Sequence, residues 1–201
     1  MAAVRRVVEP ALLAAFHDSL QKRGTNVAEL TPAQLTVELA QILDSWHIVE
    51  DAGDNRSKSG LLELLQETIG GHDAESWCMS TQQSITGVAE ALLQKRSNLP
   101  ASEGCVDVLN IARRTGVEVF SEHGEIQPGD IAIWQHLGSD RGHTGRVVRV
   151  KPDGSFTCLE GNTSGGGTGV DREGGGCYMK ERDRKAHGNM VLVGFIREAF
   201  A

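Results

Sequence analysis

The sequence lacks the features that mark several specialised classes of protein. Only 4% of its residues are aromatic, five are proline and four are cysteine, and no two cysteines form a CxxC pair. A chain of 201 residues with so few cysteines is not built on a disulfide framework, which favours a reducing compartment. No apolar run is long enough to cross a bilayer, so we expect no membrane span. These absences predict a globular protein of one domain, or of one domain with a modest extension.

An excess of positive charge is also missing. The formal net charge is -7 at pH 7, which argues against a polybasic surface for nucleic acid or anionic lipid. The basic residues Arg182, Arg184 and Lys185 alternate with acidic ones, so we expect this stretch to form a solvated face. We therefore expect no nucleic-acid partner.

A secretory signal is not visible either. Arg5 and Arg6 give a short basic start, but Glu9 and Pro10 interrupt the apolar run that should follow. We expect synthesis in the cytoplasm, so that any task outside the cell needs another route out.

Hydrophobic periodicity predicts a helical first half and a strand-rich second half. Apolar residues recur at helical spacing, and Thr31 is a good N-cap with Pro32 at the first helical position. The predicted helices cover residues 10–22, 32–46, 61–69, 77–96 and 102–116. Predicted strands cover residues 131–134, 143–150, 155–161, 177–180 and 190–196. Helices followed by an antiparallel sheet predict the α+β class.

Four polar residues form a candidate catalytic set. Cys78 follows Trp77 at the predicted start of a helix, where its thiol would lie near the positive end of the helix dipole. His143 lies on a predicted strand. Glu160 and Asn162 lie two apart on the next strand, so regular alternation would put both on one face. A thiol, an imidazole and a carboxylate or amide are the nucleophile, base and orienting group of a cysteine hydrolase.

The chemistry expected of this set follows from these residue types. His143 would take the proton of Cys78, and either Glu160 or Asn162 would accept the second ring N–H of the imidazole. With an unperturbed ring, activity would fall as His143 protonates near pH 6–7. The thiol of Cys105, like that of Cys158, fits an ordinary buried side chain.

Metal sites and cofactor sites are not indicated. No HxxxH or HxH pair occurs near a carboxylate, which argues against a zinc amidase. Asp73 and Glu75 supply too few oxygens for calcium, and loop acids such as Asp51 and Asp54 more often hold no ion. We predict no required metal and no cofactor.

Several motifs carry a resemblance to a known family. They are SWC at a helix start, PGDIAIW, GHTGRVVRV, FTCLEGNTSGG and GGGCYMKERDR. Together they resemble the CHAP family of cysteine peptidoglycan amidohydrolases and endopeptidases, most closely the compact enzymes of phage endolysins. The resemblance covers residues from about 50 to 197. It implies a papain-like fold, with a helical extension at residues 1–47 and a catalytic domain at residues 48–201.

The resemblance also implies roles for the four residues. The nucleophile falls on Cys78 and the general base on His143. The acidic third member falls on Glu160, and the polar partner falls on Asn162. The chain departs from the family pattern at Arg146, where an apolar residue is common, and in YMKERDR, where a lysine replaces an expected arginine.

The function implied is hydrolysis of an amide in bacterial peptidoglycan. The bond is either the one between the sugar lactyl group and L-alanine, as in an N-acetylmuramoyl-L-alanine amidase, or one within the stem or cross-bridge peptide. We expect a monomeric endolysin that leaves the host cytoplasm through a holin-made lesion, with a secreted toxin effector as the alternative. Two other classes stay open: an idle module that binds wall or a partner protein, and a cysteine amidase acting on a small peptide conjugate.

Overall fold

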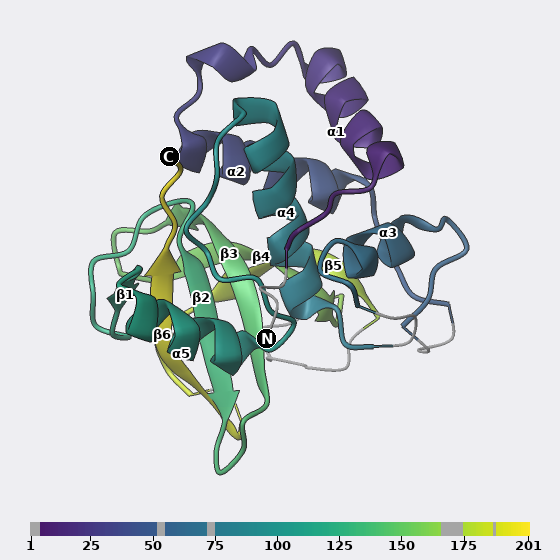
Figure 1. Cartoon of the computed structure of the whole chain (residues 1–201). Coiled ribbons are helices and arrows are strands. Elements are labelled where there is room, and N and C mark those ends of the chain that lie inside the picture. The colour runs from purple at the N-terminus through teal and green to yellow at the C-terminus, as the bar shows by residue number, and fades with distance from the viewer. Residues whose placement is uncertain (1–4, 52–54, 72–74, 166–174, 187) are drawn as a thin grey trace.

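Five α-helices and a six-stranded sheet make up the described part of the chain (Figure 1). The structure is a computed structural model that describes residues 5–51, 55–71, 75–165, 175–186 and 188–201. The helices are α1 (Pro10–Arg23), α2 (Pro32–Ser45), α3 (Leu61–Glu67), α4 (Cys78–Leu93) and α5 (Cys105–Thr115), with a short 3-10 helix η1 (Val27–Glu29). The strands are β1 (Glu118–Phe120), β2 (Ile131–His136), β3 (Gly142–Val150), β4 (Phe156–Thr163), β5 (Gly176–Arg182) and β6 (Met190–Arg197).

The strand order is β1-β6-β2-β3-β4-β5, and every neighbouring pair is antiparallel. With the helices first in the chain and the strands after them, the α+β prediction is confirmed. The five predicted helices and five predicted strands are all present with small shifts at their ends. Strand β1 is not among those predicted, because a run of three residues shows no periodicity.

Local signals set the ends of the first two long helices. Helix α1 ends at Gly24, whose φ of 67° is the left-handed conformation that glycine adopts without strain. At the start of α2, the Thr31 side chain accepts the backbone N–H of Gln34. The Gln34 side chain accepts the N–H of Thr31 in return. Such a cap is worth about 1 kcal/mol of stability.

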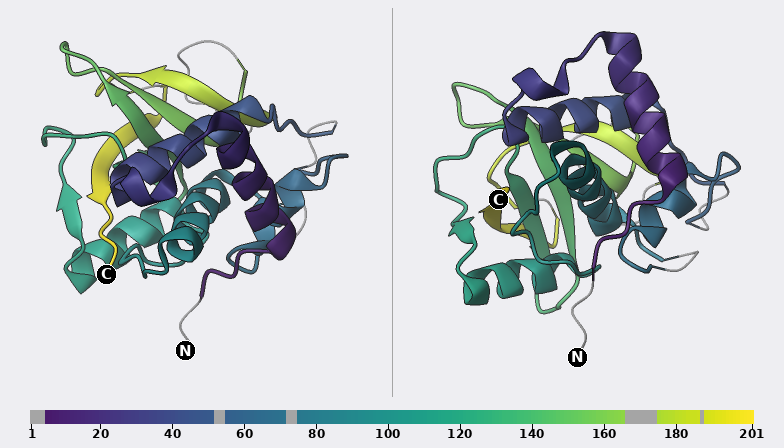
Figure 2. Two further views of the ribbon diagram at one scale, coloured as in Figure 1. Left: turned by 90° about the horizontal axis from the view of Figure 1, so that it is seen from above. Right: turned by 45° about the horizontal axis from the view of Figure 1, so that its top comes forward.

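The helices cover one face of the sheet (Figure 2). Helix α4 packs against β3 and β4, and α5 packs against β2. The core beneath them includes Leu12 of α1, Leu39 of α2, Ile85 of α4 and Leu159 of β4, all fully buried. Burying each such side chain is worth about 1.5–3 kcal/mol. The first two helices thus share a core with α4 and β4, and the boundary predicted at residue 47 stays a prediction.

Two glycines allow close packing around the sheet, Gly161 of β4 against α4 and Gly145 of β3 against β4. A Cβ atom at Gly161 would lie 2.0 Å from Oγ1 of Thr81, on α4. A Cβ atom at Gly145 would lie 2.8 Å from Cγ of Glu160. Because any larger residue at these positions would collide with its neighbour, the start of α4 and the middle of β3 and β4 come together only with glycine there.

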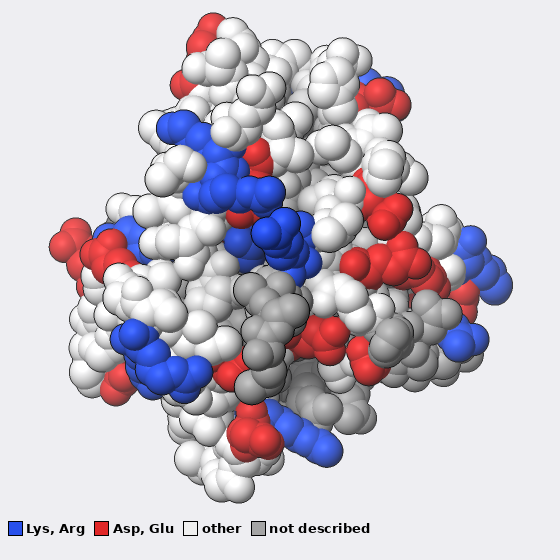
Figure 3. Space-filling view, viewed as in Figure 1, with Lys and Arg blue, Asp and Glu red and all other residues white. Residues whose placement is uncertain are grey.

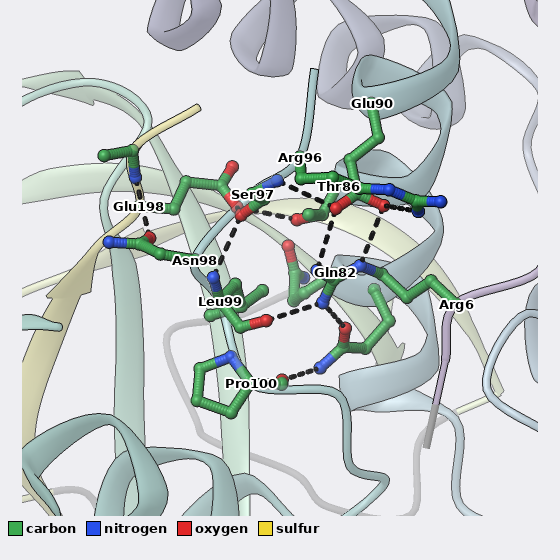
Figure 4. Close-up of polar contacts among 12 residues, drawn as sticks. Arg6, Gln82, Thr86, Glu90, Arg96, Ser97, Asn98, Leu99, Pro100 and Glu198 are labelled. Atoms are coloured by element: carbon green, nitrogen blue, oxygen red, sulfur yellow. Dashed lines mark hydrogen bonds and ion pairs between the residues drawn. The ribbon is translucent and has the colours of Figure 1, made fainter. Parts of the chain in front are cut away.

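Buried charges tie the N-terminal segment and Glu198, the residue after β6, to α4 (Figure 4). Arg6 forms an ion pair of 3.1 Å with Glu90 of α4. On the other side of α4, Arg146 of β3 is fully buried and pairs with Glu198 at 2.6 Å. Thr86 donates its hydroxyl to the same Glu198 at 2.9 Å. Arg146, which stands where the CHAP pattern commonly has an apolar residue, is therefore part of an internal ion pair. The pairing offsets the cost of burying its charge.

The face seen in Figure 1 carries both signs of charge. Lys and Arg side chains gather over the end of α4, and Asp and Glu side chains gather toward α3 (Figure 3). In the described part of the chain, no helix has the length and apolar character needed to cross a membrane.

Candidate active site

The four predicted catalytic residues lie on three elements that pack together, α4, β3 and β4. Cys78 is the first residue of α4 and follows the N-cap Trp77. His143 lies near the start of β3, and Glu160 lies in β4. The pairing of β3 with β4, and the packing of α4 on both strands, bring the thiol, the imidazole and the carboxylate into one buried cluster.

The histidine ring is held by the carboxylate. Nε2 of His143 lies 2.8 Å from Oε2 of Glu160, and neither residue is exposed. Nδ1 of His143 has no nitrogen or oxygen partner among the described residues. Because Nε2 is engaged by Glu160, Nδ1 is the ring nitrogen left to exchange a proton with the thiol of Cys78. This is the orientation that the predicted roles of His143 and Glu160 require.

Arg182 holds the other side of the carboxylate. Its Nε lies 2.5 Å from Oε1 of Glu160, and one terminal nitrogen lies 2.6 Å from Oε2. This two-point contact fixes the carboxylate plane more firmly than a single bond would. Arg182 is 2% exposed. The prediction of a solvated face is therefore wrong for this residue.

The error has a simple cause. Strand β5 alternates, so that Lys180 and Arg182 are buried while Glu181 between them is exposed. Local charge balance suggested that Glu181 neutralises Arg182, but residues adjacent on a strand point to opposite faces. The signal that could have found Arg182 is the two-residue spacing from Lys180 within a strand.

A third residue, Cys158, also donates to the carboxylate. Sγ of Cys158 donates to Oε1 of Glu160 at 3.1 Å. Cys158 is fully buried as expected, and its pKa is raised well above the ordinary value by burial first and by the charge of Glu160 second. Cys158 therefore acts as a neutral thiol donor to Glu160 and is not a nucleophile.

The ionisation of the Glu160 and His143 pair follows from these contacts. Burial alone would raise the pKa of Glu160, but the charge of His143 and the hydrogen bonds from Arg182 and His143 lower it to about 2. Burial alone would lower the pKa of His143, but the charge of Glu160 and hydrogen bonds to Cys78 and Glu160 raise it to about 9. The ring is therefore an imidazolium at neutral pH. The expected loss of activity near pH 6–7 assumed an unperturbed ring, and this assumption is wrong.

The thiol of Cys78 is shifted in the opposite direction. Its pKa is lowered well below the ordinary value, first by a hydrogen bond from Cys105 and, against the effect of burial, by the hydrogen bond and charge of His143. The backbone N–H of Met79 adds a further hydrogen bond. Cys78 and His143 therefore favour the charged pair of thiolate and imidazolium, the reactive form of a cysteine nucleophile.

Cys105 is the contact that the sequence did not reveal. Its Sγ lies 3.5 Å from Sγ of Cys78, and its residue is 4% exposed. It is buried, as expected of an ordinary apolar cysteine, but its thiol faces the candidate nucleophile. The two cysteines begin different helices, so no CxxC spacing in the sequence indicates that they are a pair.

Asn162 is buried at the end of β4, but not in a regular strand conformation. Its φ is 53°, and the pairing of β4 with β5 shifts between Glu160 and Thr163. Regular alternation is therefore interrupted between Glu160 and Asn162, and it does not put both side chains on one face as predicted. Nδ2 of Asn162 has no hydrogen-bond partner among the described residues. A buried amide donor of this kind is available to a ligand.

The site is identified by its chemistry and not by the size of a cavity. A surface cavity of about 710 Å³ lies between η1, α2 and Pro128, and Cys78 is not among the residues that line it. Within the described residues, no group of three or more His, Cys, Asp or Glu side chains is placed to hold a metal ion. Asp54 and Asp73, two acids considered as cation ligands, lie outside the described residues.

The sequence was also compared with known proteins and protein families. No curated protein matches the chain in a sequence search. Residues 73–162 match the family model of the CHAP domain, and this segment contains Cys78, His143, Glu160 and Asn162. CHAP domains are usually cysteine- and histidine-dependent amidohydrolases or peptidases. The match therefore supports the CHAP family for this segment, and with it an amidase or peptidase activity of the peptidoglycan-hydrolase type.

Proposed function

We propose that this protein is a lytic peptidoglycan hydrolase of the endolysin type, with Cys78 as its nucleophile. The bond that it cleaves would be the amide between the sugar lactyl group and L-alanine, or an amide within the stem or cross-bridge peptide. The observation that carries the proposal is the imidazole of His143, held by Glu160 on one side and interacting with the thiol of Cys78 on the other. The CHAP match over the same residues supports a wall substrate.

In the first step, the Cys78 thiolate attacks the carbonyl carbon of the scissile amide. The carbonyl oxygen becomes an oxyanion. The N–H groups in the first turn of α4 have no acceptor within the helix, so those nearest the sulfur can donate to this oxygen. One such donor is worth roughly 3–4 kcal/mol in comparable sites.

In the second step, the imidazolium of His143 gives its Nδ1 proton to the leaving amine. The C–N bond breaks and an acyl-thioester remains on Cys78. The neutral ring then takes a proton from water, which attacks the thioester and releases the thiolate. Glu160 stabilises the charged ring in each cycle, and Arg182 keeps that carboxylate in place.

Asn162 takes the part of the polar partner in this proposal. Its unpaired Nδ2 is a donor, and a carbonyl or hydroxyl of the substrate is the kind of group that would satisfy it. A buried donor without a hydrogen bond costs free energy. A substrate that places an acceptor beside Nδ2 would therefore bind more favourably.

The proposal predicts soluble products from purified sacculi. We expect turbidity to fall and mass spectrometry to find new free amino groups, either on L-alanine with a free lactyl group or within the peptide. The first outcome identifies the amidase, and the second identifies the endopeptidase. Sacculi that stay intact, with no new amino group in the supernatant, would contradict a wall hydrolase. Cleavage of soluble peptide conjugates alone would indicate the small-substrate amidase instead.

A further inference from the structure

A second thiol lies against the proposed nucleophile. Sγ of Cys105 is 3.5 Å from Sγ of Cys78, across 27 positions of sequence. Each cysteine is the first residue of its helix, Cys78 of α4 and Cys105 of α5. Both sulfurs therefore lie near the positive end of a helix, where negative charge on sulfur is stabilised.

The two sulfurs are close enough to bond after a small movement. An S–S bond is about 2.05 Å long, so the sulfurs must approach by about 1.5 Å. The two residues before Cys105, Glu103 and Gly104, are exposed, and Gly104 caps α5 without a side-chain hydrogen bond. The segment before α5 is held to α4 by hydrogen bonds from Gln83 to the carbonyls of Pro100 and Ser102, so the movement needed is a local one at the two cysteines.

The pair also differs from the other cysteines in accessibility. Cys78 and Cys105 are each 4% exposed, whereas Cys158 and Cys177 are 0% exposed. Cys78 and Cys105 are therefore the cysteines that keep some exposure to solvent, the side from which a small oxidant approaches. The thiolate form of Cys78, which His143 stabilises, is the form that peroxides oxidise.

We propose that Cys78 and Cys105 form a reversible two-cysteine oxidation site for peroxide, with Cys105 as the resolving thiol. The Cys78 thiolate first attacks one oxygen of hydrogen peroxide. An S–O bond forms, the O–O bond breaks, and hydroxide leaves and is protonated to water. Cys78 is now a sulfenic acid, oxidised by two electrons.

The second step closes the disulfide. The thiol of Cys105 loses its proton as its sulfur attacks the sulfur of Cys78. The S–S bond forms, the S–O bond breaks, and the departing hydroxide takes the proton and leaves as water. Two thiols and one peroxide thus give one disulfide and two waters. A dithiol reductant reverses the change, and until then the sulfur of Cys78 is bonded and cannot attack the substrate.

The test is mass spectrometry of the full chain. The protein is treated with stoichiometric hydrogen peroxide, blocked with N-ethylmaleimide and digested without reductant. We expect the peptides that contain Cys78 and Cys105 to be linked, and to separate with dithiothreitol. Hydrolysis of sacculi should fall more than about tenfold with peroxide and return with dithiothreitol.

Two variants sharpen the result. In Cys105→Ala, no linked peptide should form, Cys78 should proceed to the sulfinic acid, and dithiothreitol should not restore it. The matched control Cys177→Ala should still form the link. Separate Cys78 and Cys105 peptides in peroxide-treated wild-type protein, with Cys78 as sulfinic acid, would overturn the inference even if no variant folds.

The linked peptide is detected by mass spectrometry whether or not the protein hydrolyses sacculi. A linked peptide in a protein that leaves sacculi intact overturns the proposed function alone. Unlinked peptides in a protein that digests sacculi overturn only the oxidation site.

Discussion

Cys78→Ser should reduce the release of soluble fragments from sacculi by at least about 10³-fold. The structure gives the reason. His143, Cys105 and the start of α4 together favour a thiolate at this position. A serine hydroxyl is much harder to ionise, so the same surroundings leave it protonated and a poor nucleophile. The substitution changes one atom, and the fold should therefore survive.

The matched control for this variant is Cys177→Ala. Cys177 is also buried, but it lies in the hydrophobic cluster with α1 and α2, and burial raises the pKa of its thiol far above the usual range. Its loss should leave the rate within about twofold of wild type. A Cys78→Ser variant that keeps more than about one tenth of the wild-type rate would remove Cys78 from the reaction.

Glu160→Gln should both slow the reaction and move its pH limit. In the wild type, the pKa of His143 is about 9, so the imidazolium that protonates the leaving amine is present below that pH and lost above it. The charge of Glu160 is the main reason for the raised value. Without it, the alkaline limit should move down toward about pH 6.5, the value of an ordinary imidazole. At pH 8 we expect the variant to hydrolyse sacculi at least about 10²-fold more slowly than the wild type. The measurement is the hydrolysis rate as a function of pH for both proteins.

The single variant also removes the carboxylate charge that faces the buried guanidinium of Arg182. Breaking such a pair costs about 3–5 kcal/mol of stability, so Glu160→Gln alone could lose activity by unfolding. The double variant Glu160→Gln with Arg182→Met removes both charges and is the proper control. It should melt at a higher temperature than the single variant and still show the lowered alkaline limit. An unchanged limit near pH 9 in a folded double variant would contradict the role of Glu160.

Four donor atoms converge on the carboxylate of Glu160, which in turn sets the orientation and the charge of His143. His143, Cys158 and both contacts of Arg182 reach its two oxygens, and all of these residues are buried. A carboxylate that accepts this many hydrogen bonds stays ionised although it is buried. The histidine is therefore held in one orientation by a group that is itself fixed.

Much of this arrangement could be predicted from the sequence. The spacing of apolar residues located the helices, and turn residues such as Gly24 and the Thr31 cap fixed where two of them begin or end. A cysteine at a helix start, with a histidine and an acid on the next two predicted strands, was enough to suggest Cys78, His143 and Glu160. These signals are local, and the structure confirms the elements that carry them.

What could not be predicted depends on contacts between distant segments. Cys105 comes to Cys78 because α4 and α5 both pack on β3, and no pattern near either cysteine encodes that. Arg182 was hidden by acidic neighbours that share its stretch of chain but not its face of the strand. The raised pKa of His143 needs both Glu160 and the buried setting, which only a folded chain supplies.

The central claim is that Cys78 is a thiolate paired with the imidazolium of His143 at neutral pH. It is tested most directly by the rate at which iodoacetamide alkylates Cys78 between about pH 5 and pH 10, with the modified peptide identified by mass. The account predicts a rate that is already high at about pH 6 and level up to about pH 8. A rate that climbs about tenfold per pH unit toward the ordinary thiol pKa near 8.5, or a Cys78 that stays unmodified in the folded protein, would contradict it.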